Sequence, residues 1–265
     1  MAITLRSRRE IELLRNAGAV VADVLLKLKE MARPGMSTAQ LNDAAAKMAA
    51  EAGAQTLFKG VRNPGARIPF PGVICASPNE QVVHGIPSEQ TKLKEGDILS
   101  IDFGVRLSGY CGDAALTVPI GAISEENRRL IEITSSLLDT AIAMASPGVR
   151  WSTIAGKMQK MAESAGFSVV REFVGHGIGT QMHEEPRVPN FVSDELLKDD
   201  IILAEGMVLA IEPMINGGTR EVRTLKDGWT VVTRDGKCSA HFEHTIVITA
   251  DGCEVLTKQC PDGSG

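Results

Sequence analysis

Residues 31–53 read MARPGMSTAQLNDAAAKMAAEAG, and residues 144–166 read MASPGVRWSTIAGKMQKMAESAG. At a constant offset, both segments begin with Met-Ala-x-Pro-Gly, contain Lys-Met-Ala and close on Ala-Gly. In each segment the Pro-Gly pair is typical of the end of one helix, and the closing glycine of the end of a second helix. The repeat predicts an internal duplication of the chain.

A second pair of similar segments follows in the same order. Residues 95–102 read EGDILSID and residues 205–212 read EGMVLAIE, so each predicts a glycine turn and a buried strand that ends in a carboxylate. Chance similarity between common patterns is the alternative, but two matches in one order favour duplication. Because each half reads helix, helix, strands, we expect one domain over residues 1–265 with related halves at about 10–120 and 121–257. The fold class would be α+β, with helices covering an antiparallel sheet and the two carboxylates meeting at a central site.

Composition limits the classes of function. The chain has 265 residues, of which 43% are hydrophobic and 23% charged, as in a globular protein with a substantial core. A net charge of −5 argues against a nucleic-acid binder, and the basic cluster Arg6, Arg8 and Arg9 is interpreted as solvated helix surface. No apolar run predicts a membrane span or a signal segment. The five cysteines, at 75, 111, 238, 253 and 260, form no C-x-x-C pair and predict reduced thiols in the cytoplasm.

Two aspartates lie in residues 100–118, SIDFGVRLSGYCGDAALTV, which predict a hairpin around Ser108-Gly109. If Arg106 and Gly109 close a two-residue loop, Asp102 faces Asp113 with the Cβ atoms about 5 Å apart, and the like charges are destabilising. A shared proton or a divalent cation would neutralise them. Two solvated hairpin aspartates are the alternative interpretation.

The second half adds two acids and an imidazole. Glu212 follows an apolar strand, and Glu243 lies in the strand-like residues 240–248, AHFEHTIVI, where burial would require a cation or a hydrogen-bond partner. His176 lies in GHGIG, whose glycines permit close approach of the backbone. Each residue alone has an ordinary structural explanation. Together, four carboxylates and one imidazole suit two adjacent divalent ions.

Two further histidines stand in distinctive segments. His84 lies in NEQVVHGIP and His183 begins HEEP, and neither spacing is that of an H-E-x-x-H helix. An imidazole there could donate a hydrogen bond to a substrate carbonyl or transfer a proton. Structural hydrogen bonding is the alternative for each.

At this point the motifs resemble a known family, type I methionine aminopeptidases. The similarity extends from about residue 8 to residue 257 and is carried, in order, by NEQVVHGIP, SIDFGV with GYCGDAALT, GHGIG followed by HEEP, AIEPM, DGWTVVTRDG and HFEHTIVIT. The resemblance implies the pita-bread fold, with two pseudo-two-fold related halves in a single catalytic domain without an N-terminal extension. It also implies a cytoplasmic, metal-dependent aminopeptidase that removes the N-terminal methionine from nascent proteins and peptides.

The resemblance also implies roles for single residues. Asp113 and Glu243 would bridge two divalent ions (Mn²⁺, Fe²⁺, Co²⁺ or Zn²⁺), Asp102 would bind one ion, and His176 with Glu212 the other. A water bound by the ions would become a good nucleophile near neutral pH, and Glu212 would accept its proton. His84 and His183 would contact the first peptide group of the substrate and stabilise the tetrahedral intermediate.

A methionine pocket is implied at Phe70, Cys75 and Trp229. The sequence departs from the family pattern at Met182, where an aromatic residue is usual, and at Ala66-Arg67-Ile68-Pro69-Phe70, where two tyrosines often occur. Expected partners are N-terminal methionine peptides with a small second residue and, transiently, the ribosome. We expect a monomer that binds neither nucleic acid nor membrane.

Two alternatives share the fold. A proline-directed peptidase of the aminopeptidase P or prolidase type usually carries a large extra N-terminal domain, for which this chain has no room. A pita-bread protein that has become a binding module typically lacks metal ligands, whereas all five candidates are present here.

Overall fold

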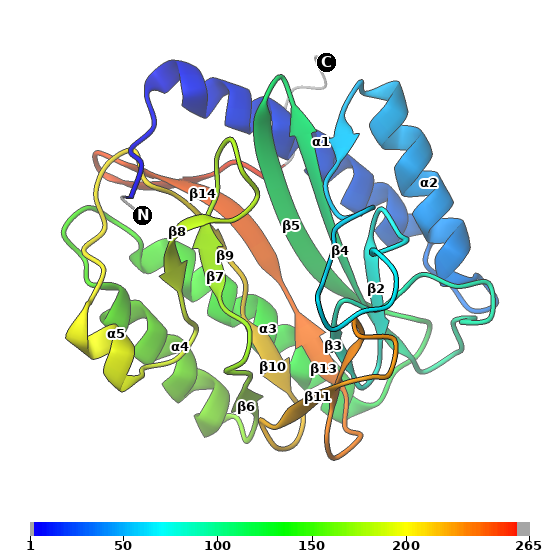
Figure 1. Ribbon diagram of the computed structural model, residues 1–265. Helices are drawn as coiled ribbons and strands as arrows, with labels where there is room; N and C mark the ends of the chain where they lie inside the picture. The colour runs from blue at the N-terminus through cyan, green and yellow to red at the C-terminus, as the bar shows by residue number, and fades with distance from the viewer. Residues whose placement is uncertain (1–2, 259–265) are drawn as a thin grey trace.

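The computed structural model describes residues 3–258 as helices packed on a curved antiparallel sheet (Figure 1). The helices are α1 (Arg8–Met31), α2 (Thr38–Glu51), α3 (Glu125–Met144), α4 (Trp151–Ser164) and α5 (Asp194–Lys198). The strands of the first half are β1 (Gln55–Thr56), β2 (Cys75–Pro78), β3 (Gln81–Val83), β4 (Ile98–Leu107) and β5 (Tyr110–Pro119). Those of the second half are β6 (Ser168–Val169), β7 (Gly175–Gly177), β8 (Glu184–Val188), β9 (Val208–Ile211), β10 (Met214–Asn216), β11 (Val222–Thr224), β12 (Val231–Thr233), β13 (Ser239–His241), β14 (Glu243–Thr249) and β15 (Gly252–Val255).

Local sequence explains where the first helices begin. Ser7 caps α1 by accepting a hydrogen bond from the backbone N–H of Glu10, whose side chain bonds back to the Ser7 backbone. Ser37 and Gln40 form the same reciprocal capping box at α2. Such boxes satisfy backbone N–H groups that have no partner within the helix. The helix boundaries therefore follow from short-range signals.

The main sheet joins the two halves. Among the described residues it contains nine strands, with the order β1-β4-β5-β14-β9-β7-β8, while β2 pairs with β4 and β15 with β14. Helix α1 packs against β4 and β5, and α2 packs beside α1. Helices α3 and α4 cover the second half (Figure 1). Each half has its own apolar core. The two halves of the main sheet meet where β5 pairs with β14.

The turns before the strands repeat between the halves. The Gly35 N–H donates to Leu93 O and the Gly148 N–H donates to Leu203 O, both at 2.8 Å. Gly96 and Gly206, which precede β4 and β9, adopt φ values of 93° and 87°. These repeated features agree with the expected α+β arrangement of two pseudo-two-fold related halves.

The register of the β4–β5 hairpin differs from our expectation. Leu107 pairs with Tyr110 around the loop Ser108-Gly109, so Asp102 faces Ala115 and Asp113 faces Gly104. The φ values of Ser108 and Gly109 are 51° and 87°, as a two-residue type I′ turn requires. The expectation that Asp102 lies directly opposite Asp113 is therefore wrong by two residues. Since side chains alternate with a period of two, both aspartates still share one face of the sheet.

The strand ends also differ in one case. Glu212 directly follows β9, as expected, but β4 continues to Leu107, so Asp102 lies in the middle of its strand. The continuation gives Asp102 neighbours on both sides, Cys75 on β2 and Ala115 on β5.

One basic residue is not solvated surface. Arg8 and Arg9 are exposed, but the Arg6 side chain is only 6% exposed and forms ion pairs with Glu10 and Glu184. The interpretation of Arg6 as solvated helix surface is therefore wrong, because the chain before α1 folds against the turn between β7 and β8.

The cysteines and the lengths of the helices also bear on the expectations from sequence. Cys75, Cys111, Cys238 and Cys253 are free thiols, as expected, and Cys260 lies outside the described residues. Within residues 3–258, no helix combines the length and the apolar character needed to span a membrane.

Candidate metal centre

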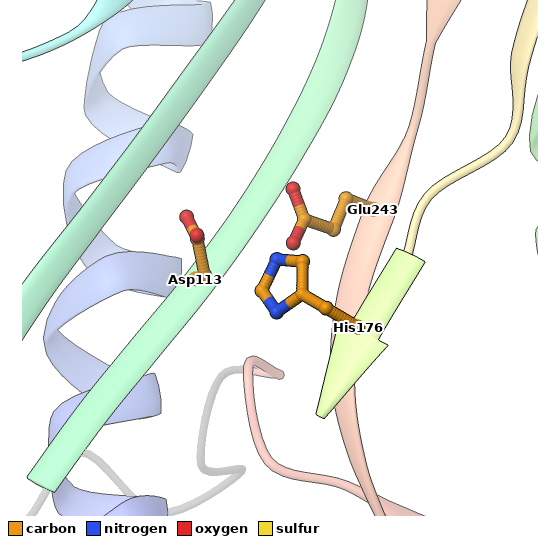
Figure 2. Close-up of side chains that lie close together, drawn as sticks. All are labelled: Asp113, His176 and Glu243. Carbon is orange, nitrogen blue, oxygen red and sulfur yellow. The ribbon is translucent and has the colours of Figure 1, made fainter. Parts of the chain in front are cut away.

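Acidic and imidazole side chains from both halves converge beside the β5–β14 junction. Donor atoms of Asp113 on β5, His176 on β7 and Glu243 on β14 lie within 4.8 Å of one another (Figure 2). A second group within the same distance contains Glu212, His241 and Glu243. The two groups share Glu243, and together with Asp102 they line one cavity of about 210 Å³. All five expected ligands are thus brought together.

Glycines make room for this arrangement. A Cβ atom on Gly104, which faces Asp113, would lie 2.9 Å from Asp113 Oδ1. On β7, a Cβ atom on Gly175 would lie 2.3 Å from Ala210 O, and one on Gly177 would lie 2.2 Å from Glu185 O. Only glycine therefore allows β7 to carry His176 so close to β8 and β9.

The carboxyl groups are buried beside one another. Burial raises the pKa of Asp102 to about 7. Burial and then the charge of Asp102 raise the pKa of Asp113 well above its usual range. Burial and neighbouring carboxylates do the same for Glu212 and Glu243. Because the described residues that line the cavity include no lysine or arginine, no basic side chain of the cavity wall neutralises these acids.

The donor atoms fit a divalent metal ion. Asp102 Oδ1, Asp113 Oδ1 and Glu243 Oε1 are buried and have no hydrogen-bond partner among residues 3–258. His176 Nδ1 lies 2.9 Å from Gly177 O, which leaves Nε2 directed toward Glu212 Oε1 at 3.5 Å. Such a contact on one ring nitrogen orients a histidine for metal binding through the other. Carboxylate oxygens with imidazole nitrogen suit Mn²⁺, Fe²⁺, Co²⁺ and Zn²⁺.

His241 belongs to the same cluster, and sequence reasoning did not single it out. Its side chain is 2% exposed, and Nε2 lies 3.8 Å from Glu212 Oε2 and 4.0 Å from Glu243 Oε2. Burial lowers its pKa to about 3, so the imidazole is neutral. The spacing of His241 and Glu243, two residues apart in a strand-like segment, was the available signal, because such residues share one face.

The two other expected histidines also line the cavity. The ring centroids of His183 and His176 are 4.3 Å apart. His84 has a φ of 59°, a strained conformation for a residue with a side chain, and its ring lies 5.4 Å from that of Phe173. Burial lowers the pKa of His84 to about 4 and that of His183 less far, so neutral imidazoles face the cavity.

Comparison with known proteins agrees with this geometry. Metallopeptidase family M24 matches residues 12–250. The chain belongs to this family. Membership makes the protein a metallopeptidase and confirms the expected use of divalent metal.

Relatives of this M24 member cover almost its whole length. Methionine aminopeptidase 1 of Bacillus subtilis is 46% identical over 256 residues, which are 97% of this chain and 99% of the relative. The methionine aminopeptidase of Escherichia coli is 41% identical over 266 residues, which are 99% of this chain and 96% of the relative. The crystal structure of methionine aminopeptidase from Thermotoga maritima has a TM-score of 0.91 and 38% identity, and the match covers 97% of this chain and 100% of that one. The family resemblance inferred from the motifs is confirmed.

A prolidase from Pyrococcus furiosus shares the fold with this M24 member. Its TM-score is 0.75 at 20% identity, and the match covers 97% of this chain and 66% of the prolidase. At that identity the likeness concerns the fold alone. Together with the methionine aminopeptidase structures, it confirms the pita-bread fold class.

An apolar pocket adjoins the acidic cluster of this M24 peptidase. Buried Phe58, Phe70, Cys75 and Trp229 pack together, and the partly buried Met182 packs against them. Trp229 Nε1 donates to Ile68 O at 3.0 Å, which fixes the indole ring. Phe58 and Phe173 line the cavity, although sequence reasoning named neither. Of the departures from the family pattern, Met182 and Ala66 therefore pack against this cluster, whereas Arg67 is exposed.

Proposed function

We propose that this M24 peptidase removes the N-terminal methionine from peptides and nascent proteins. The observation that carries the proposal is one cavity in which a cluster of unpartnered acids meets a pocket of Phe70, Cys75 and Trp229. The names of the relatives support the same activity. A small second residue is the expected substrate preference.

Five residues would hold two divalent ions. Asp113 and Glu243 would serve both ions, Asp102 one, and His176 with Glu212 the other. The placement of Glu243 in both donor groups supports its shared role. The ions, drawn from Mn²⁺, Fe²⁺, Co²⁺ and Zn²⁺, would lower the pKa of a bound water and polarise the scissile carbonyl.

Side chains of the protein would move the proton and orient the substrate. Burial raises the pKa of Glu212, which makes its carboxylate a suitable acceptor for a proton of the attacking water. His84 and His183 are neutral, and each ring can donate one N–H to the first peptide group and to the oxygen that gains charge. The strained backbone of His84 supports a role in function over one in packing.

The pocket would select methionine by shape and polarity. Aromatic rings and a thiol form its wall, and the flexible side chain of Met182 can pack against a substrate thioether. The substrate amino group would lie beside the acidic cluster, which would limit cleavage to the first peptide bond. Action on nascent chains further leads us to propose a cytoplasmic monomer with transient ribosome contact, built as one domain with duplicated halves.

The test is an assay of metal-free protein reconstituted separately with each of the four ions. We expect methionine release from Met-Ala-Ser, with little cleavage of Ala-Ala-Ser or of x-Pro peptides. Equal cleavage of Ala-Ala-Ser would contradict the methionine pocket, and preferred cleavage of x-Pro peptides would indicate a proline-directed peptidase. A protein that is inactive with every ion would instead be a binding module.

A further inference from the structure

Two threonine side chains continue the hydrogen bonding between β5 and the strands beside it, on either side of the main-chain pairing of β5 with β14. The main-chain pairing there comprises Glu243 with Ala115 and His244 with Ala114. In the same antiparallel register, Thr245 stands opposite Asp113. The Thr245 hydroxyl accepts a hydrogen bond from the Asp113 backbone N–H at 3.2 Å and donates one to the Asp113 backbone O at 2.7 Å. One hydroxyl thus serves both main-chain groups of a proposed metal ligand.

Thr117 does the same on the other side of that pairing. Its hydroxyl accepts from the His241 N–H at 2.8 Å and donates to His241 O at 2.9 Å. Because its single proton is used there, the Ser100 hydroxyl, 2.8 Å away, donates to it. Thr117 and Thr245 are both buried, so water does not replace these hydrogen bonds.

The two contacts are related by the pseudo-two-fold symmetry of the fold. The same difference in residue number separates Asp113 from His241 and Thr117 from Thr245, so these residues occupy corresponding positions in the two halves. The same offset converts Ile120, whose N–H donates to Asp97 O, to Ile248, whose N–H donates to Met207 O. Corresponding threonines therefore hold corresponding cavity residues across the junction of the halves.

We propose that Thr117 and Thr245 are positioning residues that set the separation of β5 and β14 beside the metal centre. A hydroxyl inserted between two strands takes the place of direct N–H···O=C bonds, so it would hold the strands farther apart than in a regular ladder. Asp113 and His241, each with a donor atom within 4.8 Å of one of Glu243, would then be held at the spacing that the ions require. The inference rests on the proposed metal-dependent function.

The test compares Thr245→Val with Thr245→Ser. Valine keeps the shape of threonine but leaves the Asp113 N–H and C=O without their partner, whereas serine keeps the hydroxyl. Loss of a group that orients a metal ligand typically weakens metal binding by about 10- to 100-fold. By calorimetry on metal-free protein, we expect Mn²⁺ affinity to fall in this range for Thr245→Val and to stay within about threefold of wild type for Thr245→Ser.

Thr134→Val is the matched control. Thr134 is also fully buried, but its hydroxyl donates to Leu130 O within α3. We expect this variant to bind Mn²⁺ as tightly as wild type. Normal affinity in Thr245→Val, or equal losses in the valine and serine variants, would overturn the proposal. If Thr245→Val does not fold, Thr117→Val tests the strand separation from the His241 side, and it should bind Mn²⁺ more weakly than Thr117→Ser does. Failure of both valine variants to fold would show a folding role instead.

Asp113→Asn separates this inference from the proposed function. If wild type binds Mn²⁺ and Asp113→Asn does not, the metal centre stands whatever the threonine variants do. If wild type itself binds no divalent ion, the proposed function fails first.

Discussion

Replacement of Glu243 by glutamine should have opposite effects on the metal-free and metal-loaded protein. Glu243 is 3% exposed, and burial followed by the charges of Asp113, Glu212 and Asp102 raises its pKa. A carboxyl group with a raised pKa destabilises the folded state as pH rises above its unfolded pKa of about 4.3. Glutamine has no such proton to lose. Metal-free Glu243→Gln should therefore be more stable than wild type at pH 8, and the difference should shrink toward pH 5.

The distance to Asp113 sets the magnitude. Oxygen atoms of Glu243 and Asp113 lie within 4.8 Å of each other. With an effective dielectric constant of about 20, two unit charges at that separation repel by roughly 3.5 kcal/mol. For a chain of this size, that energy corresponds to a rise in Tm of up to about 10 °C. The glutamine NH₂ group can donate hydrogen bonds to the neighbouring carboxylates, so an unpartnered amide should not cancel this gain in stability.

Thermal unfolding of both proteins between pH 5 and pH 8, with and without Mn²⁺, measures the effect. With metal, the glutamine variant should gain less stability than wild type and lose at least 100-fold in methionine release, because it lacks the carboxylate that we propose serves both ions. A metal-free variant less stable than wild type at pH 8 would refute the reasoning. Near-wild-type turnover with metal bound would refute the proposed role of Glu243.

Three further predictions concern the same centre. Mn²⁺ affinity should rise between pH 6 and pH 8, because burial raises the pKa of Asp102 to about 7 and a carboxyl group must lose its proton to bind a metal ion. Calorimetry in buffers of different ionisation enthalpy should detect the released protons. Arg6→Met removes the ion pair with Glu184, which fixes the turn before His183. The KM for Met-Ala-Ser should therefore rise several-fold while the circular dichroism spectrum stays unchanged, and an unaltered KM would exclude this role of Arg6. Gly104→Ala would place a Cβ 2.9 Å from Asp113 Oδ1, and we expect Mn²⁺ affinity, measured by calorimetry, to fall about tenfold.

The sequence motifs predicted residues that line the site but not the register of the β4–β5 hairpin. The five expected ligands line one cavity, but the facing of Asp102 and Asp113 was wrong although Ser108-Gly109 was identified as the turn. Leu107 pairs with Tyr110 because both loop residues, Ser108 and Gly109, adopt positive φ. The sequence pattern alone does not distinguish this loop from one shifted by one or two residues along the chain. Register errors of this kind keep the face of the sheet and change the partner.

Contacts between distant segments were beyond local patterns. His241 joins Glu212 because β13 and β10 pair across the second half, and Arg6 reaches Glu184 because the chain before α1 folds back on the β7–β8 turn. Each contact depends on where a whole element packs. For Arg6 the local sequence gives no sign of this contact, and for His241 the only local signal was its spacing from Glu243.

Short-range chemistry encoded the helices, their capping boxes and the repeated Pro-Gly turns, because those features depend on residues three or four positions apart. The acidic residues and histidines of the site could likewise be recognised from the motifs in which they occur along the chain. Packing of the two halves against each other decided which atoms meet at the β5–β14 junction, including the threonine contacts that hold it. The distances between residues of different halves depend on how the apolar side chains of both cores are buried together, and no single segment of sequence determines them.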